Sequence, residues 1–273
     1  MSLRSPKQWR DSASYAFAIV AAIGIIQSVV GITLVDVFPQ LPWWQLLAAS
    51  LLAFLVILAA VYVVLMKMAA KGVSLRIHGI PVTIKQGDLF TAQGWKIISC
   101  TDHFDTDVND VRIAATSVNG VFITDHVNDD LEALKKVIAE DAAKQKPQSR
   151  IRDRTTFPLG HCIAFKGEYI LLSFAHLSER NVAHLSMAEY VTCLMTMWQE
   201  VRRLYANKPV CLPLLGSGIL SLDNITEKSN EDLLKIMLYT LKMSGEHINQ
   251  PVTILLTQEV MQGINLYEVK ASL

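Results

Sequence analysis

The sequence has no surplus of either charge, because Lys and Arg total 25 and Asp and Glu also total 25. A neutral chain has no general electrostatic attraction to a phosphate backbone, so composition does not favour nucleic acid as a partner. Cysteine is scarce too, with four residues in 273 and no C-x-x-C or other ligand spacing. We therefore expect buried, reduced thiols in a cytosolic domain, with neither a disulfide framework nor a metal site.

The first 70 residues contain two long runs without charge, and these explain the positive mean hydropathy of +0.31. Residues 15–35 and 43–66 are each long enough to cross a hydrocarbon core of about 30 Å as a helix. No small-residue cleavage site follows the first run, and the second comes directly after it, which argues against a cleaved signal peptide. We predict a transmembrane helical hairpin over residues 1–70 and a second domain over 71–273.

The turn between the two runs lacks Lys and Arg and contains Pro39 and Pro42. Basic residues instead flank the hairpin on its outer sides, at Arg4, Lys7, Arg10, Lys67, Lys71 and Arg76. The positive-inside rule then predicts a multi-pass topology with both termini and the second domain in the cytoplasm, and with the lipid bilayer as a partner.

The second domain alternates apolar runs with amphipathic segments, which predicts an α/β/α sandwich around a mixed sheet. The expected strands cover residues 73–85, 97–100, 161–165, 169–174, 210–215 and 252–256, with an edge strand at 266–269. The expected helices cover residues 129–144, a segment that begins with the capping box at Ser186, and 229–245. Residues 145–156, with three arginines, are predicted to form a loop facing anionic lipid.

The strand at residues 210–215 is almost wholly apolar and ends in Gly216-Ser217-Gly218. A loop at the carboxyl end of a central strand is where ligands sit in open α/β sheets. Glycines there allow close approach of a ligand, and the backbone N–H groups between them can cradle a phosphate. An ordinary strand-to-helix turn would show the same pattern, so the loop alone leaves both interpretations open.

Three motifs together resemble a macro domain, the ADP-ribose-binding fold. They are Gly87-Asp88-Leu89 after one strand, a polar loop after Cys100, and the 215–219 loop after a later strand. Four features are more narrowly similar to the divergent macro domain of Thoeris anti-phage effectors: Phe157-Pro158-Leu159-Gly160, the hairpin with Ser173 to His176, the helix holding Trp198, and Pro213-Leu214-Leu215-Gly216-Ser217-Gly218. One branch of those effectors carries two transmembrane helices before the macro domain, and the resemblance covers essentially the whole chain.

The resemblance implies roles for matching positions. Asp88, with the backbone of Leu89, would read the adenine amino group, and the 215–219 loop would wrap the diphosphate. The first phosphate and ribose loop would be at 117–121, although only Gly120 is glycine there. The complete set of implied ligand-binding residues is Asp88, Leu89, Thr101, Asp102, His103, Phe104, Asp105, Asn119, Gly120, Val121, Ser173, Leu215, Gly216, Ser217, Gly218 and Ile219.

The sequence departs from hydrolytic macro domains at residues 101–106, which replace their Asn-Ala-Ala-Asn run. The resemblance therefore implies a binding protein without catalytic residues and without a cofactor. Its ligand would be an ADP-ribose derivative, histidine-ADP-ribose, made from NAD by a partner TIR-domain protein. Binding would promote homo-oligomerisation and disruption of the bacterial inner membrane, leading to abortive infection.

Two other functions stay open at this point. In a membrane-tethered hydrolase of ADP-ribose adducts, His103 would act as the base and Asp102 or Asp105 would orient it. In a plain scaffold, the macro fold would bind nothing.

Overall fold

The computed structural model describes residues 6–31, 34–109, 113–144, 148–151, 154–178, 182–218, 220–223 and 229–273. The chain divides into two compact units. One comprises Met1–Gly72 with Asn265–Ser272, and the other comprises Val73–Ile264 with the final residue. Each unit is considered by itself.

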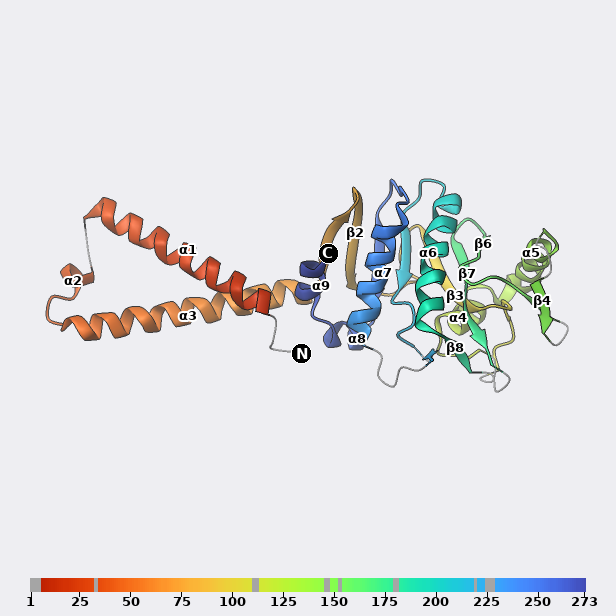
Figure 1. Cartoon of the computed structure of the whole chain (residues 1–273), viewed down its shortest axis with the longest axis horizontal. Helices are drawn as coiled ribbons and strands as arrows, with labels where there is room; N and C mark the ends of the chain where they lie inside the picture. Colours follow the sequence, from red (N-terminus) through yellow and green to blue (C-terminus); the bar gives the residue numbers. More distant parts are fainter. Residues whose placement is uncertain are drawn as a thin grey trace. The chain divides into compact units, whose positions relative to one another are not determined.

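The first unit is a helical hairpin. It consists of α1 (Pro6–Val30), α2 (Leu34–Val37) and α3 (Trp43–Ala70). By length and composition, α1 and α3 are each able to cross a membrane, and many of their described large apolar side chains are exposed. Figure 1 shows that the two helices meet where α1 begins and diverge toward α2.

A further helix, α9 (Leu266–Ser272), packs against both α1 and α3. The prediction of an edge strand at 266–269 is therefore wrong. Leu266 and Val269 are both buried, and a spacing of three residues places side chains on one face of a helix, whereas a strand would bury alternate residues.

The second unit is built on one mixed sheet with the order β1-β2-β11-β9-β3-β7-β8-β10, with β6 paired to β7. The strands are β1 (Val73–Ile77), β2 (Ile80–Gln86), β3 (Trp95–Thr101), β6 (Cys162–Phe165), β7 (Tyr169–Leu177), β8 (Ala183–Leu185), β9 (Val210–Pro213), β10 (Ser221–Leu222) and β11 (Val252–Leu256). The run from β2 to β7 is parallel throughout. β1 is antiparallel to β2, with Val73 opposite Ile84.

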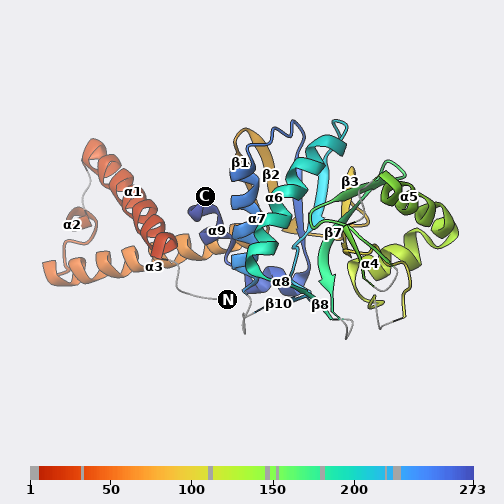
Figure 2. The same cartoon turned by 45° about the vertical axis from the view of Figure 1, so that its right-hand side comes forward.

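Helices cover both faces of this sheet, which confirms the α/β/α sandwich. On one face, α6 (Met187–Leu204) and α7 (Asn230–Ser244) lie side by side, as Figures 1 and 2 show. A separate apolar cluster joins the sheet to a segment of α4 (Val118–Val121), the π-helical turn η1 (Phe122–His126), the 3-10 turn η2 (Asn128–Asp130) and α5 (Leu131–Lys144). A short helix, α8 (Gln258–Gly263), follows β11.

Local signals in the sequence account for most of these boundaries. Ser186 and Glu189 form both hydrogen bonds of the predicted capping box, and Gly245 ends α7 in the left-handed conformation. The prediction of a loop over 145–156 is wrong in part. There β4 (Gln148–Ile151) and β5 (Arg154–Thr156) pair as a separate antiparallel hairpin, in which backbone pairing overrides the polar composition. Arg152 lies outside the described residues.

Candidate functional site

Parallel pairing brings several strand ends to one edge of the sheet. β2, β11, β9 and β3 all point the same way, so the segments that follow them meet at their carboxyl ends. Asp88 follows β2, Asp102 follows β3, the 214–218 loop follows β9, and Thr257 follows β11. This is the edge at which ligands bind in open α/β sheets.

A β-bulge lies at the same edge, between β3 and β7. Cys100 pairs with Ser173, but the next residue, Thr101, pairs with Ala175. The Asp102 N–H then donates to the carbonyl oxygen of Ala175 at 2.9 Å. A bulge changes the direction of the side chains that follow it. Thr101, the last residue of β3, lines the central cavity described next, whereas Asp102, directly after β3, contacts His176.

The central cavity, of about 130 Å³, collects predicted residues from three distant segments. Its lining includes Thr101, Asn119, Gly216 and Gly218. Gly216 has φ +86°, which favours glycine, and the Tyr190 hydroxyl holds the loop by donating to the carbonyl oxygen of Leu215 at 2.9 Å. The cavity also contacts residues that the sequence did not single out, among them Ile113, Phe174, Ala183 and Leu220.

The first residues of α4 form one wall of the central cavity. The Gly120 N–H donates to Ser117 Oγ at 3.0 Å, and Cys100 Sγ donates to Asn119 Oδ1 at 3.6 Å. Burial raises the pKa of the Cys100 thiol, so it stays protonated and can donate. Val121 lies within α4 and does not line the cavity.

A second cavity, of about 440 Å³, lies at the ends of β2 and β11. We call it the purine-end cavity because the resemblance assigns the adenine group to Asp88, which is part of its lining. It is lined by Asp88, Leu89, Phe90, Thr257 and Gln258, together with residues of the strand ends. One oxygen of the exposed Asp88 carboxylate accepts the Phe90 N–H at 3.0 Å. Thr257 and Gln258 were not predicted, although the same strand-end rule that selects Asp88 applies to the residues directly after β11.

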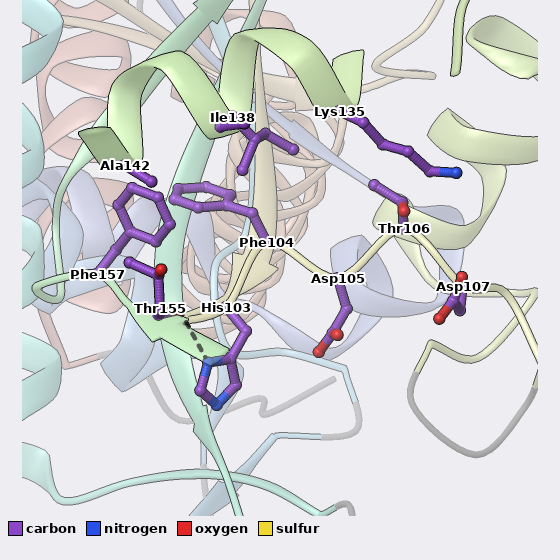
Figure 3. Close-up of a pocket in the computed structure, with 11 residues that line it drawn as sticks. His103, Phe104, Asp105, Thr106, Asp107, Lys135, Ile138, Ala142, Thr155 and Phe157 are labelled. Atoms are coloured by element: carbon purple, nitrogen blue, oxygen red, sulfur yellow. Dashed lines mark hydrogen bonds between the residues drawn. The ribbon is translucent and has the colours of Figure 1, made fainter. Parts of the chain in front are cut away.

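A third cavity, of about 360 Å³, lies between α5 and the 103–107 segment (Figure 3). His103, Phe104 and Asp105 line this cavity and not the central one. Phe104 is buried edge-on against Phe157, with ring centroids 4.8 Å apart, and this packing turns the segment toward α5. His103 Nδ1 lies 3.1 Å from the carbonyl oxygen of Thr155.

Asp102 is only 3% exposed and joins this edge to α6. Its Oδ2 lies 2.7 Å from His176 Nδ1, and its Oδ1 lies 3.7 Å from His103 Nε2. His176 Nε2 in turn lies 3.6 Å from Glu189 Oε1. His176 and Glu189 were not predicted as site residues, because their proximity to Asp102 depends on the bulge and on the tertiary fold.

Three predicted residues have positions that need separate mention. Ser173 is fully buried in β7 and its Oγ donates to the carbonyl oxygen of Phe157 at 3.5 Å, so it lines none of the three cavities. Ser217 Oγ donates to the carbonyl oxygen of Leu214 at 2.8 Å, within the loop. Ile219 lies outside the described residues.

The hydrogen bond that His176 donates to the Asp102 carboxylate raises the pKa of His176, against the lowering effect of partial burial. The stabilisation from this pair should therefore be complete below the unfolded-state value of about 6.5 and be lost as pH rises through the higher folded-state pKa. We expect His176→Gln to destabilise the protein more at pH 6 than at pH 9. Urea unfolding at both pH values checks this, with the exposed His247→Gln as control. An equal loss at both pH values would contradict it.

No group of three His, Cys, Asp or Glu side chains with the arrangement of a metal site occurs within the described ranges. The four cysteines are free and buried. The candidate site consists of polar side chains and backbone loops that line three cavities.

Comparisons with known proteins agree on the family. The family model described as "Thoeris protein ThsA, Macro domain" matches residues 82–257. The Thoeris protein ThsA of Bacillus amyloliquefaciens (strain Y2) is 35% identical over 210 residues, which cover 72% of this chain and 69% of that protein.

Among solved structures, the Oceanobacillus iheyensis macrodomain with ADP aligns at 13% identity and a TM-score of 0.49. The alignment covers 74% of this chain and 95% of that one. The same macrodomain with MES bound aligns at 13% identity and a TM-score of 0.48, over 74% and 94% of the two chains. The family model and the ThsA relative together show that this chain belongs to the ThsA macro domain family of Thoeris proteins.

Proposed function

We propose that the macro domain binds an ADP-ribose-derived signal nucleotide in an anti-phage defence system. The observation that supports this most directly is the shared edge of the sheet. Asp88 follows β2, and the loop that contains Gly216 follows β9. Both strands are parallel to β11, so their carboxyl ends lie at the same edge, and a cavity lies at each of these two ends. The carboxylate would accept the adenine amino group, while the loop and the start of α4 would surround the diphosphate.

We propose further that the distal ribose carries a polar or cationic substituent, with histidine-ADP-ribose as the signal. The support is the third cavity, which begins two residues after Thr101 in the lining of the central cavity. Asp105 and Asp107 contribute carboxylates to it, and Phe104 and Phe157 contribute aromatic surface (Figure 3). An imidazole or ammonium group suits such a lining.

Binding without turnover is the proposal for this site. A general base must reach the reacting atoms at the distal ribose. His103 lines the third cavity, and its Nδ1 is within hydrogen-bond distance of the Thr155 carbonyl, while Asp102 Oδ2 is engaged with His176. These contacts support positioning roles for His103 and Asp102 better than the roles of base and orienting residue that a membrane-tethered hydrolase would need.

The helical hairpin would make this chain a membrane effector. α1 and α3 expose apolar side chains along most of their length, as lipid-facing helices do. We propose that the signal comes from a NAD-consuming TIR-domain partner. Binding would favour association of several copies in the bacterial inner membrane, with the macro domain in the cytoplasm, and the assembled hairpins would disrupt the membrane.

The direct test is calorimetry of the full chain in detergent with ADP-ribose and with histidine-ADP-ribose. Both should bind, and the conjugate should bind more tightly. Equal affinities would remove the proposed substituent, and no binding of either would remove the proposed function.

Replacing Asp88 with asparagine should change base selectivity. Asn keeps an oxygen for the Phe90 N–H but presents an amide donor where adenine also presents a donor. We expect affinity for ADP-ribose to fall about tenfold, because a hydrogen bond to a charged group is lost, while the inosine analogue should lose less. Calorimetry with both nucleotides measures this, with Asp129→Asn on the exposed turn before α5 as control. An unchanged preference for adenine would show that Asp88 does not read the base.

A further inference from the structure

The α8–α9 segment runs from the purine-end cavity to the hairpin. Gln258, which lines that cavity, is the first residue of α8, and two residues separate the end of α8 at Gly263 from the start of α9 at Leu266. α9 is grouped with the hairpin and contacts both α1 and α3. The family match ends at residue 257, so this segment is an addition to the matched macro domain.

α9 is attached to α1 by a specific polar contact. The Tyr267 hydroxyl donates to Asp11 Oδ2, and Leu266 and Val269 bury the apolar face of α9. Burial and the neighbouring Asp11 carboxylate raise the pKa of Tyr267, so the phenol stays protonated and keeps its donor at physiological pH. A charge-assisted hydrogen bond of this kind is stronger than a neutral one.

The hairpin is packed like a protein interior at one end only. Within the described parts of α1 and α3, the buried residues are Gln8, Ser12, Ala16 and Tyr62. Trp9 stacks on Tyr62 there, with ring centroids 4.5 Å apart. This packed end, which we call the hairpin base, is where α9 binds; beyond it, the two helices diverge (Figure 1).

The hairpin base contains two buried polar side-chain atoms that make no hydrogen bond to a described residue. Ser12 Oγ and Glu268 Oε1 are buried without a hydrogen-bond partner in the part of the chain that the structure describes. Unsatisfied buried polar atoms carry a desolvation cost that an alternative arrangement can remove. A ligand that binds slightly more tightly to a state in which α9 is released from the hairpin base can therefore shift the equilibrium toward that state.

We propose that α8 and α9 form a strap that carries the occupancy of the purine-end cavity to the hairpin base, with Tyr267 and Asp11 as its attachment. Nucleotide against Thr257 and Gln258 shifts α8, and the shift releases α9 from α1. The proposal rests on the proposed function for the nucleotide, whereas the attachment rests on the contact between Tyr267 and Asp11 alone.

The test uses Ser12→Cys in the full chain as a reporter. Ser12 is fully buried and its hydroxyl makes no hydrogen bond to a described residue, so a thiol replaces it at little cost. The four native cysteines are buried, which keeps background labelling low. We expect slow maleimide labelling of Cys at position 12, and labelling about tenfold faster when Tyr267→Phe is added, because a charge-assisted hydrogen bond is lost. Tyr239→Phe, on the surface of α7, is the matched control and should leave the rate unchanged.

Saturating ADP-ribose should accelerate labelling in the reporter and have no further effect when Tyr267→Phe is present. Unchanged or slower labelling in the nucleotide-bound reporter would overturn the proposed release. Equal labelling with and without Tyr267→Phe, before any nucleotide is added, would overturn the attachment. Calorimetry on the same samples shows whether ADP-ribose binds at all. If it does not bind, the proposed function is contradicted, and the labelling rates with and without Tyr267→Phe, measured before nucleotide is added, still decide the attachment.

Discussion

Gly216→Val should lower the affinity for ADP-ribose about 100-fold, because a β-branched residue is strained in the left-handed conformation that this position adopts. A Cβ here would lie in ordinary van der Waals contact, 3.4 Å from Tyr190 and 3.5 Å from Leu233 side-chain atoms, so the cost comes from the backbone conformation. The loop can relieve the strain only by moving, and its N–H groups then lose the positions that would face the diphosphate.

Calorimetry of the full chain measures the effect, and Gly245→Val is the matched control. Gly245 also has a positive φ, +66°, but it ends α7 and lies outside the linings of the three cavities. Both variants should lose a similar amount of folding stability, whereas the Gly216 variant alone should lose nucleotide affinity. Retained binding in folded Gly216→Val would contradict the proposed contact between this loop and the diphosphate, whereas no binding by the unsubstituted chain would favour the scaffold interpretation.

Gly120→Ala should destabilise the domain by about 3 kcal/mol, through overpacking against the backbone. A Cβ at Gly120 would lie 2.2 Å from the Ala114 carbonyl oxygen and 2.8 Å from that of Ala115, and backbone atoms cannot rotate away as a side chain can. α4 would have to shift, and with it the Asn119 wall of the central cavity. Nucleotide affinity should therefore fall together with stability.

Urea unfolding and calorimetry test this prediction, with Gly218→Ala as the control for stability. No atom lies within 4 Å of a Cβ at Gly218, and its φ is ordinary, so the substitution should change stability by no more than about 0.5 kcal/mol. A folded Gly120→Ala variant of normal stability would show that α4 can adjust, and would leave Gly120 without the packing role described above.

The sequence predicted the elements that rest on local patterns. The capping box at Ser186, the apolar strands and the glycine after α7 each depend on neighbours in the chain, and the structure confirms all three. The resemblance implied that residues after β2 and β9 contribute to one site, and the structure places both segments at one edge, because both strands are parallel to β11. The failures at 145–156 and at 266–269 concern short segments, where tertiary contacts outweigh composition.

The grouping of the polar residues after β3 was less predictable. The resemblance implies that residues 101–105 face the ligand together. In the structure, a bulge and the burial of Phe104 divide them between the central cavity, the His176 contact and the third cavity. The spacing of residue types along the sequence does not show a one-residue shift in strand register, and it does not show that His176 lies next to Asp102. The role of Gly120 in ligand binding stays a prediction, and the structure adds a packing constraint that the resemblance did not supply.

The antiparallel start of the sheet has a topological consequence. Val73 faces Ile84, four residues before Asp88, so the polypeptide enters the domain beside the end of β2 that leads to the purine-end cavity. It departs through α8, next to the same cavity. Both chain connections of this domain therefore lie at the same end of β2 and β11, next to one cavity.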